Sequence, residues 1–166
     1  MFDLAGEYEL VSRDADGRVL GSLTFPNGPT VDGVNYLANC GFRGGARIAA
    51  WYVGLINETG FVALDEFDSH SSHGGWSEFT NIAGGLRQPW SPAAAVDGLL
   101  DSPNVAFSIT ASGTVRGAFL ASQQATGTSS GPTLYCTAVA DAGVAVVNGG
   151  ALTFSYKLRI TKGTGE

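Results

Sequence analysis

The feature that most constrains this chain is a strict alternation near its C-terminus. Between residues 152 and 160, apolar side chains occupy the even positions and polar side chains occupy the odd positions. Successive side chains of a β-strand point to opposite faces of a sheet, so this segment predicts a strand with one buried and one solvated face. Asn148-Gly149-Gly150 precedes it and follows the apolar run 144–147, and together these segments predict a β-hairpin.

Similar patterns recur along the rest of the chain. Asp14-Ala15-Asp16-Gly17 separates two strand-like runs and predicts a second hairpin, in which the glycine supplies a left-handed turn conformation. Ser112-Gly113 separates two further runs and predicts a third hairpin. The other predicted strands are 7–13, 18–25, 51–56, 105–110, 114–121 and 133–140.

Only residues 30–39 have a helical pattern. Thr30 or Asp32 can cap the N-terminus, and Gly41 can end the helix. By contrast, residues 65–95 lack a period and are rich in Gly, Ser and Pro. A loop of this length in a compact domain is usually functional or packed onto the body.

The predicted elements define the fold class. Eight or nine short strands without βαβ alternation indicate an all-β chain that forms an antiparallel two-sheet sandwich with one short helix. A jelly roll is the favoured topology, and an immunoglobulin-type sandwich is the alternative. We expect a single domain over residues 1–166, preceded within that range by an apolar N-terminal arm, 1–6.

Composition argues against several classes of function. Charged residues make up 14% of the chain, the formal net charge is −6, and two lysines and seven arginines are scattered without a basic stripe. Nucleic acid is therefore not an expected partner. No run of eighteen apolar residues occurs and the N-terminus lacks a basic region, so we expect neither a membrane span nor a signal peptide.

The chain's two histidines lie in one loop, and we predict that they are not metal ligands. His70 and His73 are surrounded by carboxylates that could join them in a metal site of the cupin kind, namely Asp65, Glu66, Asp68 and Glu78. However, a third histidine is missing and a Gly-rich loop is not a rigid ligand frame. Their expected role is to cap backbone groups or to face a neighbouring subunit.

A G-x-S-x-G match at residues 127–131 does not predict a nucleophile. A proline and a strand follow it, whereas a nucleophile elbow needs a helix there and a histidine later in the chain. We therefore expect no catalytic residues, no metal and no cofactor, and we interpret the protein as a non-enzyme.

The tryptophans and the N-terminal arm supply the candidate interaction residues. Trp51 opens an apolar strand and is assigned to the core. Trp76 and Trp90 lie in the long loop, where they either anchor it to the body or contact a partner, including a sugar ring. The arm either lies on a neighbour or folds back on its own core. The predicted interaction residues are Phe2, Leu4, His73, Trp76 and Trp90.

Several motifs in one order resemble a family of small proteins from tailed bacteriophages, encoded among virion structural genes. The resemblance runs from about Gly17 to Ile160 and includes Phe25-Pro26-Asn27-Gly28-Pro29-Thr30, Asn35-Tyr36-Leu37, Trp51-Tyr52-Val53-Gly54-Leu55, Gly75-Trp76-Ser77-Glu78, Arg87-Gln88-Pro89 and Gly117-Ala118-Phe119-Leu120. Some members resemble jelly-roll cement, or decoration, proteins on the outside of the capsid.

The resemblance implies a role and partners. It implies a capsid cement protein that binds the major capsid protein on the outer head surface and self-associates as a dimer or trimer. The protein would be made in the host bacterial cytoplasm and located in the virion. A sugar-binding jelly-roll module on the virion and a tail protein are the alternative hypotheses.

Overall fold

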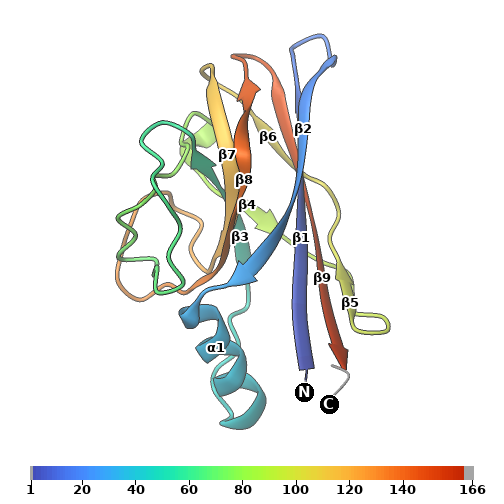
Figure 1. Cartoon of the computed structure of the whole chain (residues 1–166), viewed down its shortest axis with the longest axis vertical. Coiled ribbons are helices and arrows are strands. Elements are labelled where there is room, and N and C mark those ends of the chain that lie inside the picture. The colour runs from blue at the N-terminus through green and yellow to red at the C-terminus, as the bar shows by residue number, and fades with distance from the viewer. Residues whose placement is uncertain (1, 163–166) are drawn as a thin grey trace.

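The computed structural model describes the backbone of residues 2–162 and the side chains of residues 4–161 (Figure 1). Over this range the chain is mostly β-structure with one α-helix. The elements are β1 (Phe2–Arg13), β2 (Val19–Pro29), α1 (Val31–Phe42), β3 (Trp51–Asn57), the 3-10 turn η1 (Ala83–Gly85), β4 (Gln88–Trp90), β5 (Leu99–Asp101), β6 (Val105–Ser108), β7 (Gly113–Ala121), β8 (Leu134–Val146) and β9 (Ala151–Lys162).

The strands form one curled antiparallel sheet in the order β4-β3-β7-β8-β2-β1-β9-β5, with β6 also paired to β9. Strand β2 connects the two halves, because it pairs with β1 along most of its length while Gly28 and Pro29 pair with β8. The sheet therefore curls around its core as a half-barrel. The antiparallel β-class with one helix is confirmed, whereas a separate two-sheet jelly-roll sandwich is not.

The hairpin predicted around residues 14–17 is confirmed, and its first strand includes the segment expected to be an arm. Strands β1 and β2 flank the turn at residues 14–17, where Gly17 has a φ of 82°. Residues 2–6 are not an arm but the start of β1, which pairs with β9 from Phe2↔Lys162 to Arg13↔Ala151. From Gly6 onward β1 is paired on both edges, whereas residues 2–5 are paired on the β9 side only. Residue 1 lies outside the described residues.

The other two predicted hairpins are wrong. Strand β8 pairs with β7 and β2 while β9 pairs with β1, so the turn at residues 148–150 carries the chain across the core. Residues 109–112 make a similar crossing, since β6 pairs with β9 and β7 pairs with β3 and β8. The turn residues reverse the chain in both places, but the partner strand depends on which face each strand buries.

Helix α1 projects from the body below β2 and β3 (Figure 1). The predicted cap is confirmed, because the Thr30 hydroxyl accepts a hydrogen bond from the Gly33 amide at 3.1 Å. Gly33 is the helix's one fully buried residue, and a Cβ there would lie 2.0 Å from the Tyr135 carbonyl oxygen. The helix extends three residues beyond the predicted end and contains Gly41, since Arg43 serves as its C-cap.

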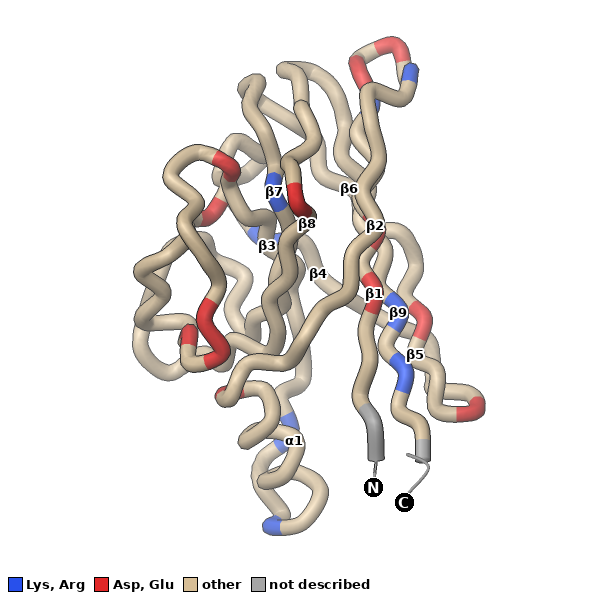
Figure 2. Tube along the Cα trace, in the orientation of Figure 1, with Lys and Arg blue, Asp and Glu red and all other residues tan. Residues whose placement is uncertain are grey.

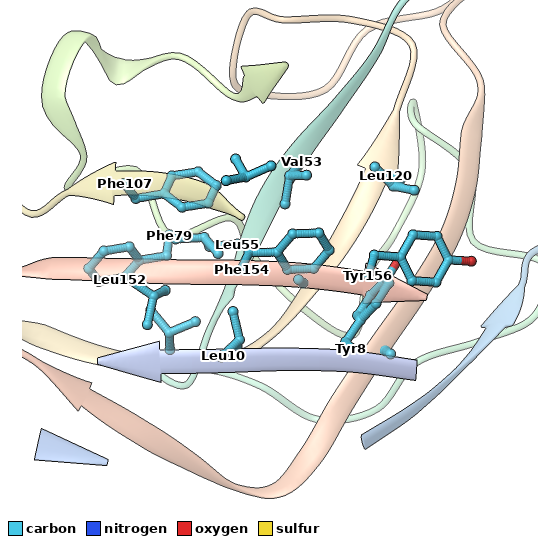
Figure 3. Close-up of a cluster of buried hydrophobic side chains, with 14 of the residues drawn as sticks. Tyr8, Leu10, Val53, Leu55, Phe79, Phe107, Leu120, Leu152, Phe154 and Tyr156 are labelled. Carbon is cyan, nitrogen blue, oxygen red and sulfur yellow. The ribbon is translucent and has the colours of Figure 1, made fainter. Parts of the chain in front are cut away.

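The core lies inside the curl of the sheet (Figure 3). Aromatic rings from β1 and β9 meet at its centre, where Tyr8 contacts Phe154 and Tyr156 edge-on at centroid distances of 4.9 and 4.6 Å. A second buried cluster lies around Ile56 and Phe119. Within residues 2–162, no helix has the length and apolarity needed to cross a membrane.

Candidate functional site

The long loop between β3 and β4 is fastened to the sheet by Trp76. Its ring is 5% exposed and lies 5.1 Å from the ring of Phe119 in β7. Its indole Nε1 donates a hydrogen bond to Asp68 Oδ2 at 2.8 Å. Of the two interpretations, the structure therefore places Trp76 as an anchor of the loop, without the exposed face that a contact residue needs.

His73 covers the outer side of this anchor. Its ring stacks on Trp76 with a centroid distance of 3.8 Å and an interplanar angle of 13°. Its Nδ1 lies 3.2 Å from the Trp76 carbonyl oxygen, so the side chain caps a backbone group as expected. His73 remains half-buried, and an interaction role for it stays a prediction.

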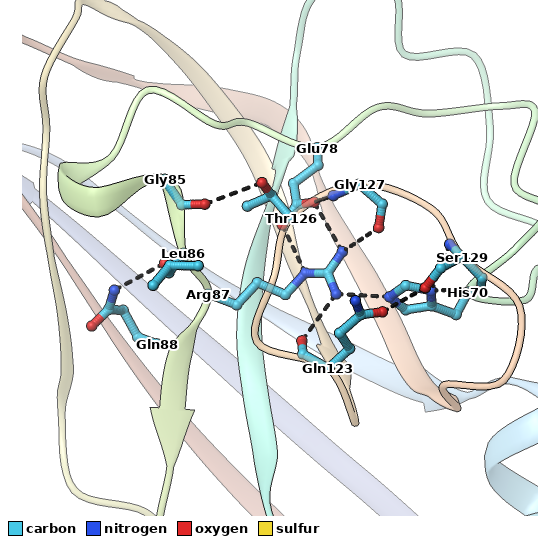
Figure 4. A network of polar contacts seen from close by, with 10 residues as sticks. All are labelled: His70, Glu78, Gly85, Leu86, Arg87, Gln88, Gln123, Thr126, Gly127 and Ser129. Carbon is cyan, nitrogen blue, oxygen red and sulfur yellow. Dashed lines mark hydrogen bonds and ion pairs between the residues drawn. The ribbon is translucent and has the colours of Figure 1, made fainter.

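A buried arginine joins this loop to the loop between β7 and β8 (Figure 4). Arg87 is 2% exposed and forms a bidentate ion pair with Glu78 at 2.8 and 2.9 Å. Its remaining donors bind His70 Nε2 at 2.7 Å and the carbonyl oxygens of Gln123 and Gly127 at 3.0 Å each. A guanidinium has five N–H donors, and here all five have partners.

These contacts determine the protonation state of His70. Because a guanidinium only donates, His70 Nε2 accepts from Arg87, and its Nδ1–H donates to the Ser129 carbonyl oxygen at 3.0 Å. Burial lowers the pKa of His70, and the positive charge of Arg87 acts in the same direction. His70 is therefore a neutral structural acceptor, and we name the set His70, Glu78, Arg87 the clasp.

The clasp accounts for the two patterns that suggested chemistry. The two histidines are committed to different partners, and no group of three or more metal-ligating side chains gathers in the described part of the chain. In the G-x-S-x-G segment, the Ser129 hydroxyl donates to Gln123 Oε1 at 2.6 Å and its carbonyl binds His70. This loop is held as a structural partner of the clasp, without a nucleophile–base pair.

Arg87 was not predicted as a central residue. It lies between a glycine-rich turn and a strand of three residues, and its local sequence contains no helical or strand period. Its partners come from three places along the chain, Glu78, His70 and residues 123–127. One sequence signal could have identified it: Arg87 is an isolated charge in a segment otherwise poor in charged residues. A buried arginine needs a paired carboxylate, which would have pointed to a nearby acid as its partner.

Trp90 lies in a different environment, beside an apolar hollow. It is half-buried, pairs across the strands with Trp51 and lies 5.4 Å from the ring of Tyr156. Its Nε1 is buried without a hydrogen-bond partner. The hollow measures about 200 Å³ and is lined by Tyr36, Leu37, Trp51, Trp90, Leu100, Tyr135 and Leu158.

Of the two arm residues predicted to interact, the structure describes the side chain of Leu4 only. Leu4 is half-buried and packs against the main core, as the second interpretation of the segment expected. The side chain of Phe2 lies outside the described residues. The exposed apolar surface lies elsewhere, at Val19, Leu20, Val34, Leu37, Phe42, Val62, Phe67, Leu86, Val96 and Ile160.

The buried thiol offers no nucleophile. Cys136 lies 2.8 Å from the Tyr8 hydroxyl in the core, and burial raises its pKa to about 12. Because the thiolate is the reactive form, this cysteine is inert at neutral pH. Cys40 is half-buried and lies on α1.

No known family model matches this chain, and the search of curated proteins finds no match either. The resemblance to phage virion proteins therefore stays a prediction.

Proposed function

We propose that this protein is a structural component of a phage virion, a cement protein that binds the major capsid protein on the outer surface of the head. The observation that carries the proposal is the number of large apolar side chains exposed on a rigid, weakly charged body. Four of them are more than two-thirds exposed, namely Phe42, Val62, Phe67 and Val96. Contiguous exposed apolar patches are typical of surfaces that meet another protein, and the substitutions described below test whether these side chains form one.

The internal construction supports the same role. The clasp and the Trp76 anchor fix the two long loops, so the exposed side chains on them are held in place before any partner binds. A surface that is already ordered loses little conformational entropy on association. A cement protein binds the assembled shell and stabilises it by mass action, without catalysis.

The proposal includes the jelly-roll topology expected for cement proteins. Two connections, between β6 and β7 and between β8 and β9, carry the chain from one half of the sheet to the other across the core. Crossings of this kind occur where consecutive strands of a jelly roll alternate between its two faces.

The test is to locate the protein and to map its binding face. We expect imaging of intact particles to place it on the head, and purified protein to bind shells that lack it and raise their disruption temperature. Absence from purified virions would overturn the proposal, and location on the tail would favour the tail-protein alternative.

Substitutions then identify the contact surface. In the shell-binding assay, Val62→Glu, Phe67→Glu and Val96→Glu each place a charge at an exposed apolar position. The position in contact with the shell is expected to lose about 30-fold in affinity, the effect of a 2 kcal/mol contact. Asn81→Glu is the matched control, because Asn81 is exposed and polar. Equal binding by all four variants would show that these side chains form no interface.

A second candidate, a sugar-binding module, is favoured by the environment of Trp90 alone. A half-buried aromatic ring beside an apolar hollow can stack on the face of a pyranose. The test is a glycan array with the native protein and with Trp90→Ala. A signal that disappears in the variant would support this function, and no signal from the native protein would remove it.

A further inference from the structure

A polar groove runs along one face of helix α1. It has a volume of about 840 Å³, larger than that of the apolar hollow beside Trp90. The helix forms one wall, and the two loops joined by the clasp form the other. Four polar side chains at three- and four-residue spacing line the helix wall, namely Asp32, Asn35, Asn39 and the C-cap Arg43. Residues with this spacing lie on one face of a helix, so the groove follows the helix axis.

The loop wall is held in place by the clasp. Ser69, which lines the groove, exchanges two backbone hydrogen bonds with Ser72, at 2.9 and 3.1 Å. His70 lies between these serines, and its Nδ1 contacts the Ser129 carbonyl oxygen at 3.0 Å. This contact ties the first loop to the second, whose residues 131–133 also line the groove. A groove with walls fixed in this way loses little conformational entropy when a ligand enters it.

The two ends of the groove carry opposite charges (Figure 2). Asp32 lies in the first turn of α1 and is half-buried, and Arg43 lies at the other end and is exposed. None of the ion pairs formed by the described side chains includes either residue. Eleven residues of helix separate them by about 16 Å. A ligand that matches both ends therefore has a cationic and an anionic group at about this separation.

Between the two charges the groove presents side-chain amides. Asn35 and Asn39 are both exposed, and they lie four residues apart, which is about 6 Å along the helix axis. A side-chain amide has donors and an acceptor, so it can bind the C=O and the N–H of a peptide group. In an extended chain, peptide groups that point in the same direction recur every two residues, or about 6.6 Å. The spacing of the two asparagines thus matches the backbone repeat of an extended peptide.

We propose that this groove binds an extended segment of a partner protein, with a basic side chain beside Asp32 and an acidic side chain beside Arg43. Asn35 and Asn39 each bind one peptide group of the segment between these ends. At about 3.3 Å per residue, the distance of about 16 Å corresponds to a segment of about five residues. The inference goes beyond the capsid role and does not depend on it. Absence from virions would leave the groove's ligand unchanged, and failure to bind a peptide would leave the capsid role unchanged.

A neutral oligosaccharide fits these observations less well. It would leave both Asp32 and Arg43 without a partner of opposite charge. Of the residues that line the groove, Tyr36 alone is aromatic, and its ring packs edge-on against Trp51 while its hydroxyl accepts a hydrogen bond from the Ile48 amide. The groove therefore matches the charge and the backbone groups of a peptide better than it matches the face of a sugar ring.

The first experiment titrates the full chain with the peptide acetyl-Lys-Ser-Ala-Ser-Glu-amide and follows the asparagine side-chain signals by NMR. We expect a dissociation constant of roughly 0.1–1 mM, because a contact of five residues is much smaller than a standard interface. The double variant Asn35→Ala/Asn39→Ala should weaken binding about tenfold. Asn81→Ala is the matched control, because Asn81 is exposed and does not line the groove. No binding up to roughly 10 mM peptide, or equal weakening in the two variants, would overturn the proposal.

The second experiment tests the two kinds of contact separately. Arg43→Glu should weaken binding of this peptide, and acetyl-Lys-Ser-Ala-Ser-Lys-amide should bind the variant more tightly than it binds the native chain. A peptide with the same side chains and N-methylated serines loses backbone donors and should bind the native chain less tightly. If the charge exchange restores no affinity, or if N-methylation has no effect, the proposed mode of binding is wrong. A response to maltopentaose without a response to the peptide would overturn the proposal in favour of a glycan.

Discussion

Removal of Arg87 is the sharpest test of the clasp. The Arg87→Met variant keeps much of the apolar stem but loses all five hydrogen bonds of the guanidinium. Glu78, whose side chain is 7% exposed, is then left buried with the Gly127 amide as its remaining donor. Breaking one side of a buried ion pair costs about 3–5 kcal/mol, because the other charge remains without compensation.

This loss is large relative to the stability of a domain, which is about 5–15 kcal/mol. For a chain of this length it corresponds to a fall in Tm of about 6–20 °C. The assay is urea unfolding at pH 7.5, followed by circular dichroism, with an unchanged m-value required for the comparison.

The matched control is Arg18→Met. Arg18 pairs with Asp14 and Asp16, but its side chain is 77% exposed, and such pairs contribute less than about 1 kcal/mol. A double variant, Arg87→Met with Glu78→Leu, removes both charges and is expected to recover part of the lost stability. If Arg87→Met and Arg18→Met reduce the unfolding free energy equally, the clasp does not stabilise the fold and the reasoning fails.

Three further outcomes follow from the structure. The folded-state pKa of His70 is lowered below its unfolded value of about 6.5, so the unfolded chain binds more protons at low pH and stability should fall as the pH drops below about 6.5. His70→Gln should flatten this dependence in urea titrations from pH 7.5 to 5, and an unchanged dependence would refute this role of His70. Trp76→Phe keeps an aromatic, though smaller, ring but leaves the buried Asp68 carboxylate with one donor fewer, which should cost about 1–3 kcal/mol or more in the same assay. An unchanged midpoint would show that this hydrogen bond is not needed. Gly117→Ala would place a Cβ 2.0 Å from a backbone carbonyl oxygen, and it should lower Tm by several degrees or prevent folding. Gly28→Ala is the control, because no atom lies within 4 Å of the added carbon, and its unfolding free energy should stay within about 1 kcal/mol of that of the native chain. Equal thermal melting of these two variants would contradict the close packing of β7 on β8.

Local patterns predicted the elements of this fold well, because their causes are local. Alternation along β9, the Asp-Gly turn after β1 and the Thr30 cap of α1 each depend on residues within a few positions of one another. Only the ends of these elements shifted, as where α1 continued past Gly41 to Phe42. Side-chain period and turn chemistry therefore determined the fold class and the position of the helix.

Strand partners and the clasp were decided by the tertiary structure. A Gly-Gly turn reverses the chain, but whether β9 then pairs with β8 or crosses to β1 depends on burying Phe154 and Tyr156 against Tyr8, more than a hundred residues away. Arg87 likewise obtained its role from partners that are distant in sequence. Burial and ion pairing depend on distance in space, and for these residues the fold alone brings the partners together.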